Sequence, residues 1–131
     1  AVAAALMAWF CHNNTDESKQ KLPALLMARV PGYAWDQPWT GRVGVTGLEC
    51  VAAALAAVVA HNSLSAILTC CVEYGGDVDT VAAIAMAAAS GSREVEQNLP
   101  GHLVEGLENG GYGRDYLVKL DQRLHEVVTS P

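Results

Sequence analysis

The segment GLECVAAALAAVVAHNSLSAILTCCVEYGGDVDTVAAIAMAAASG, residues 47–91, decides the fold of this chain. Small and aliphatic residues fill three long runs, which are separated by the polar pair Asn62–Ser63 and by the glycine pair Gly75–Gly76. No run alternates between apolar and polar residues as a half-buried strand would. Alanine favours helices more than any other residue. The segment therefore predicts an all-α fold of several helices joined by short loops.

Helix boundaries are marked by capping residues, prolines and glycines. Thr46 and Glu49 form a T-x-x-E capping box, Ser63 offers a second N-cap, and Pro100 suits the first turn of a later helix. The glycine pair is expected to end the helix before it. The predicted helices span residues 47–61, 64–74, 80–90, 100–109 and 114–128.

Length and charge narrow the class of protein. A chain of 131 residues is the size of one domain, and its 51% hydrophobic and 6% aromatic residues suit closely packed helices. The net charge of −6 argues against nucleic-acid binding, which needs clustered basic residues. The longest apolar run, Cys50–Ala60, is too short to span a membrane.

The four cysteines, at positions 11, 50, 70 and 71, show neither the C-x-x-C spacing of a zinc site nor the density of a disulfide scaffold. We interpret them as reduced, mostly buried thiols. Together with the lack of a targeting signal, this interpretation predicts a cytoplasmic protein.

The first ten residues, AVAAALMAWF, have the character of a helix interior, without an initiator Met, a basic leader or an N-cap. We therefore expect the chain to be a piece of a longer protein. A Pro/Gly/Trp-rich loop at residues 30–47 follows, and its aromatic content indicates that it packs on the helices or lines a cleft.

Asp77 and Asp79 lie one residue apart at the entrance to an apolar run. If the helix begins only at Thr80, the two aspartates occupy an extended segment and their carboxylates share a side. With the Thr80 hydroxyl they would offer the hard oxygen ligands that Mg²⁺ or Mn²⁺ prefers. The simpler alternative is that Asp79 is an N-cap and Asp77 a solvated turn residue. Neither reading is an EF-hand, because the later ligand positions of such a loop hold apolar residues.

The stretch GGDVDTVAAIAMAAASG, residues 75–91, closely resembles the signature of the ADP-ribosylglycohydrolase family, in which a GGD-x-D-T turn precedes a helix of small residues. The preceding residues 47–74 resemble the two helices that lead into that turn. The resemblance covers most of residues 42–128. It is more specific than an isolated D-x-D pattern because all five defining positions match.

This resemblance implies a multi-helix hydrolase that cleaves the glycosidic bond at the ribose C1″ of an ADP-ribosylated protein or related substrate. It also implies a pair of divalent cations, Mg²⁺ or Mn²⁺, in a binuclear site. Carried over by position, Asp77, Asp79 and Thr80 would be metal ligands. The residues expected to bind substrate are Gly75, Gly76, Val43 and Gly44. No catalytic residue is assigned.

The resemblance also implies that part of the site lies elsewhere. Family members run to roughly twice this length, and their N-terminal half carries a further acidic residue, a T-D-D metal motif and a Gly-rich phosphate loop. None of these motifs occurs in this sequence. We therefore expect residues 1–131 to be a single partial domain, the C-terminal half of the fold. Its partner would be the N-terminal half, and alone it would bind metal weakly and have little activity.

A second hypothesis is that the protein is a non-catalytic helical relative, either structural and crystallin-like or ADP-ribose-binding. Asp77 and Asp79 would then remain only as helix caps. Two interpretations are also open for Trp35 and Trp39, which could stack on adenine or anchor the loop by packing. The four histidines show no ligand spacing, and none is proposed to be catalytic.

Overall fold

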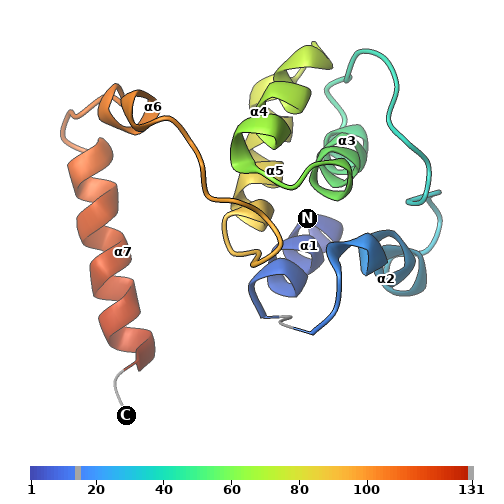
Figure 1. The fold of residues 1–131 in the computed structure, drawn as a ribbon, viewed down its shortest axis with the longest axis horizontal. Helices are drawn as coiled ribbons and strands as arrows, with labels where there is room; N and C mark the ends of the chain where they lie inside the picture. Colours follow the sequence, from blue (N-terminus) through green and yellow to red (C-terminus); the bar gives the residue numbers. More distant parts are fainter. Residues whose placement is uncertain (14–15, 130–131) are drawn as a thin grey trace. The chain divides into compact units, whose positions relative to one another are not determined.

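The computed structural model describes residues 1–13 and 16–129, and these residues form helices and loops with no β-strand. The all-α prediction is confirmed. In chain order the elements are α1 (Val2–Asn13), the short 3-10 helix η1 (Lys19–Lys21), α2 (Leu22–Arg29), α3 (Gly47–Ala60), α4 (Leu64–Glu73), α5 (Val78–Ala89), α6 (Gly101–Glu105) and α7 (Arg114–Thr129) (Figure 1).

The chain divides into two compact units, Ala1–Asn98 and Leu99–Pro131. The first unit contains α1 to α5, and α5 lies at its centre because it contacts α1, α3 and α4 (Figure 1). The turn that leads into α5 is therefore attached to a helix held on several sides.

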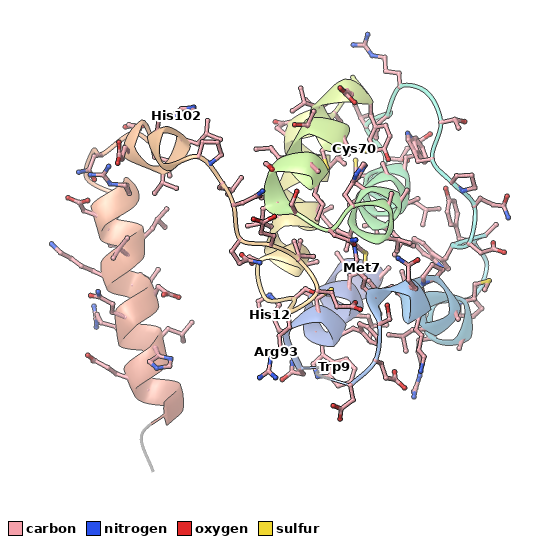
Figure 2. The ribbon with its side chains drawn as sticks, in the orientation of Figure 1. Met7, Trp9, His12, Cys70, Arg93 and His102 are labelled. Carbon is pink, nitrogen blue, oxygen red and sulfur yellow. The ribbon has the colours of Figure 1, made fainter. Side chains whose placement is uncertain are left out.

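Alanine side chains let α3 and α5 approach closely. The alanines of these two helices that are at most 1% exposed are Ala53, Ala54, Ala57, Ala85, Ala88 and Ala89. Larger side chains from the other elements, such as Met7, Leu22 and Ile67, are fully buried and fill the remaining interior; Met7 is labelled in Figure 2. Because interiors are close-packed, these small residues determine how near the two helix backbones come.

The caps that the sequence predicts for α3 and α4 are present. The Thr46 hydroxyl accepts a hydrogen bond from the Glu49 N–H at 3.4 Å, and the Ser63 hydroxyl accepts one from the Ala66 N–H at 3.3 Å. The Thr46 hydroxyl also donates to the Glu49 carboxylate at 2.8 Å. The two side chains of the capping box are therefore bonded directly to each other.

Two predicted boundaries are wrong. The helix expected to begin at Thr80 begins at Val78, because Asp77 already occupies the N-cap position. The helix expected over residues 100–109 ends at Glu105. The glycines that follow, at 106, 110 and 111, disfavour further helix, so the chain forms a turn before α7.

The second unit is a short helix followed by an amphipathic one. The Asn109 side chain accepts a hydrogen bond from the Asp115 N–H at 2.9 Å, and the Arg114 guanidinium donates to the Glu105 carbonyl at 3.0 Å. These bonds fix the turn between α6 and α7. Among the helices of the described residues, none is both long and apolar enough to cross a membrane.

Candidate functional site

The turn before α5 is built by two glycines with left-handed backbones. Gly75 has φ of +67° and Gly76 has φ of +86°, a region that other residues rarely enter. At Gly76 a side chain is excluded for a second reason, because an added Cβ would lie 1.9 Å from the Val43 carbonyl oxygen. The glycine pair therefore reverses the chain and also lets another segment come into contact with it.

That segment is the end of the Trp-rich loop. The Val43 N–H donates to the Gly75 carbonyl at 3.0 Å, and the Asp77 N–H donates to the Val43 carbonyl at 3.3 Å, which makes a short parallel bridge. Val43 is only 3% exposed. The bridge joins the loop predicted to face the substrate to the turn predicted to hold metal.

Asp77 and Asp79 meet, although not in the way that the sequence suggested. Asp79 belongs to the first turn of α5, so the two residues are not in one extended segment. Both nevertheless line the same cleft, and the Thr80 hydroxyl, followed by the Asp79 carboxyl, holds the pKa of Asp77 below its usual value. Asp77 therefore carries its charge at neutral pH.

The alternative in which Asp79 caps the helix is also wrong in its detail. Asp77 occupies the N-cap position, but its carboxylate makes no well-formed hydrogen bond to a helix N–H. The Thr80 N–H also lowers the pKa of Asp77, but its contribution is the smallest. The Asp77 carboxylate therefore does not cap the helix, and its hydrogen-bond partners are neighbouring side chains.

Cys50, which the sequence indicated only to be a reduced, mostly buried thiol, lies beside Asp77. Its thiol sulfur lies 3.4 Å from Asp77 Oδ2 and 3.7 Å from the Gly44 carbonyl oxygen, so its one proton is donated to either acceptor or shared between them. Burial and then the bond to Asp77 raise the pKa of this thiol, so Cys50 is a neutral donor. The only signal in the sequence was its place directly after the capping box, in the first turns of α3.

These segments border an open cleft of about 620 Å³. A Cβ added at Gly44 would lie 2.4 Å from a carboxylate oxygen of Glu49, so a larger residue here would require the Glu49 side chain to shift. Thr80 does not line the cleft, but its hydroxyl is hydrogen-bonded to Asp77, which does. The lining residues are Arg42, Val43, Gly44, Val45, Gly76, Asp77 and Asp79.

A comparison with models of known protein families matches the chain to ADP-ribosylglycohydrolase over residues 1–131. The chain belongs to the ADP-ribosylglycohydrolase family. Searches of curated proteins and of solved structures find no match. At the level of the family, the chain is therefore a hydrolase of the ADP-ribosylglycohydrolase type, and the family implies ADP-ribosylated substrates.

The donors of this ADP-ribosylglycohydrolase fit a hard divalent cation. Asp77 and Asp79 offer carboxylate oxygens at the cleft, and Thr80 offers a hydroxyl oxygen beside Asp77; such oxygen donors suit Mg²⁺ or Mn²⁺ better than zinc. Over the described residues, however, no group of three or more His, Cys, Asp or Glu side chains could hold a metal ion. The donor type of these residues suits such a cation, and their number is smaller than the set of ligands that Mg²⁺ or Mn²⁺ takes.

The two tryptophans of the loop act as packing anchors to different degrees. Trp35 is 3% exposed and donates from Nε1 to the Val30 carbonyl at 2.8 Å. Trp39 is half-buried and donates to the Gly41 carbonyl at 3.0 Å. Both line a second cavity of about 320 Å³, together with Tyr74. Trp35 is therefore a packing anchor of the loop, while the Trp39 ring is partly exposed to solvent.

The remaining residue predictions concern cysteines and histidines. All four cysteines are free, as expected, and three of them are buried. His12 lies in the last turn of α1, and its Nε2 lies 2.9 Å from the Ala87 carbonyl oxygen; Figure 2 labels this side chain. This contact gives His12 a structural role between α1 and α5.

Proposed function

We propose that this protein is a divalent-metal-dependent hydrolase that cleaves the C1″ glycosidic bond of an ADP-ribosylated protein or a related ADP-ribosyl compound. Asp77, Asp79 and Thr80 would hold Mg²⁺ or Mn²⁺. The observation that carries this proposal is the meeting of Asp77 and Asp79 in one cleft, beside the loop that the Val43 bridge attaches to them.

Each residue of the cleft has a role that follows from its contacts. The Thr80 hydroxyl lowers the pKa of Asp77 below its usual value, and the charged carboxylate is available to bind a cation at neutral pH. Cys50 donates to one oxygen of Asp77 and orients that carboxylate. Gly76 and the bridge to Val43 hold the turn in place. When bound, the cations would supply Lewis-acid chemistry at the ribose.

We further propose that residues outside positions 1–131 complete a binuclear site. Two carboxylates and one hydroxyl are too few to surround two divalent cations, which each take about six oxygen ligands. On this proposal the isolated chain binds metal weakly and is close to inactive. The four free thiols suit the reducing cytoplasm as the proposed compartment.

The test uses the protein in its longest natural form. Release of ADP-ribose would be measured from a panel of ADP-ribosylated proteins, with Mg²⁺ or Mn²⁺ supplied and again after chelation. We expect release that depends on metal and that is lost in the Asp77→Asn/Asp79→Asn variant. Asp121→Asn, an exposed substitution of the same chemistry on α7, is the matched control and should retain activity.

Two outcomes would separate the alternatives. A folded wild-type protein that releases no ADP-ribose with metal present would favour the non-catalytic helical relative. Metal-dependent release that persists in the double aspartate variant would remove this turn from the catalytic site, although the protein would remain a hydrolase.

A further inference from the structure

Arg42 is held at the edge of the cleft by its position in the chain. It directly precedes Val43, whose N–H and carbonyl are both bonded to the turn before α5. Its side chain then runs over the glycine pair, since a Cβ added at Gly76 would lie 3.0 Å from Arg42 Cγ and one at Gly75 would lie 3.9 Å from it. The start of the Arg42 side chain is thus fixed beside the two aspartates.

The Arg42 guanidinium has no partner within the described part of the chain. Neither an ion pair nor a hydrogen bond of the Arg42 side chain is found there, in contrast to Lys21, which pairs with Glu17, and Arg114, which pairs with Asp115. Arg42 is exposed, although Asp77 and Asp79 line the same cleft. A guanidinium has five N–H donors, and all of them are open to a ligand here.

The charge of the cleft makes this guanidinium significant. Arg42 is the one cationic side chain among the lining residues, and it shares the cleft with two carboxylates in a protein with a net charge of −6. An anionic ligand entering the cleft would be repelled by those carboxylates unless a cation met it. The planar fork of an arginine binds two phosphate oxygens at once, which a lysine does not.

We propose that Arg42 is a specificity-determining residue that binds a phosphate oxygen of the ligand in this cleft. The inference rests on the proposed function and deepens it, because it names the residue through which the chain would select phosphate-bearing ADP-ribosyl compounds over neutral ribosides. Asp77 and Asp79 would act on a different part of the same ligand.

The test compares an anionic and a neutral ligand by calorimetry, on the protein in its longest natural form with Mg²⁺ present. ADP-ribose carries two phosphates, and adenosine carries none. We expect Arg42→Gln to weaken ADP-ribose binding about ten- to a hundredfold, the usual effect of losing charge-assisted hydrogen bonds. Its affinity for adenosine should not change. Arg42→Lys should lie between wild type and Arg42→Gln, because it keeps the charge and loses the fork.

Arg93→Gln is the matched control. Arg93 is an exposed arginine of the first unit that does not line the cleft, and it is labelled in Figure 2. The Arg93→Gln variant loses the same charge as Arg42→Gln. If the effect of Arg42→Gln is local to the cleft, Arg93→Gln should leave ADP-ribose affinity within about twofold of wild type.

Three results would overturn the inference. Unchanged ADP-ribose affinity in Arg42→Gln would refute it and leave the proposed function intact. Equal losses for ADP-ribose and adenosine would show a general disturbance of the cleft. A wild-type protein that neither binds nor releases ADP-ribose would refute the proposed function, and the role of Arg42 with it.

Discussion

Replacement of Gly76 by alanine tests whether the bridge to Val43 holds the turn in place. Gly41 supplies an unusually close control, because both glycines have φ of +86°. A Cβ at Gly41 would meet no atom within 4 Å, whereas a Cβ at Gly76 would lie 1.9 Å from the Val43 carbonyl oxygen. The two alanine variants therefore share the backbone strain and differ in the steric clash.

The structure separates the two contributions to the loss of stability. The left-handed backbone costs an alanine about 1–2 kcal/mol, and this cost applies to both variants. In Gly76→Ala the clash falls on backbone, so the segment at Val43 has to move away. The two hydrogen bonds of the bridge would then be lost, at about 0.5–1.5 kcal/mol each. We expect about 1–2 kcal/mol for Gly41→Ala and about 2–5 kcal/mol for Gly76→Ala.

Urea unfolding followed by circular dichroism would measure both free energies of unfolding. Equal slopes against urea would show that the midpoints report stability alone. The same samples would be assayed for ADP-ribose release, which Gly76→Ala should impair and Gly41→Ala should spare. If Gly76→Ala proves no less stable than Gly41→Ala, the contact between the turn and Val43 does not constrain the protein and our reasoning about the site fails.

Three further predictions concern a cap, a buried thiol and the aspartate pair. Thr46→Ala removes the N-cap of α3 and should lower the free energy of unfolding by about 0.5–2 kcal/mol in urea titrations. Cys71 is fully buried, and burial raises its pKa from 9.0 to about 11. The folded state thus keeps a proton that the unfolded chain releases, so stability should fall as pH rises from 9 to about 11, by up to about 3 kcal/mol. Cys71→Ala should lose that part of the pH dependence, and an unchanged slope would contradict the assignment. Thr80→Val removes the main group that lowers the pKa of Asp77, so NMR titration of the metal-free protein should find this pKa raised toward 3.8, while Thr80→Ser should keep it low.

Local chemistry determined most of the helical fold. The capping residues Thr46 and Ser63 and the glycine pair act on backbone within a few residues, so the bounds of α3 and α4 were predictable to about one residue. The start of α5 was missed because the sequence cannot say which of two nearby aspartates takes the N-cap position. The length of α6 was missed because Gly106 and the Gly-rich turn outweighed the favourable proline at the start.

Only the tertiary structure brought the parts of the site together. The sequence singled out Asp77 and the GGD-x-D-T turn, but it contained no pattern that pairs Val43 with Gly76 or Cys50 with Asp77. Those contacts join residues that are far apart in the chain. They exist because α3 and α5 pack closely through their alanines, which brings the loop before α3 and the start of α5 to one cleft. Sequence periodicity describes one helix at a time, whereas a cleft depends on how two helices and a loop meet.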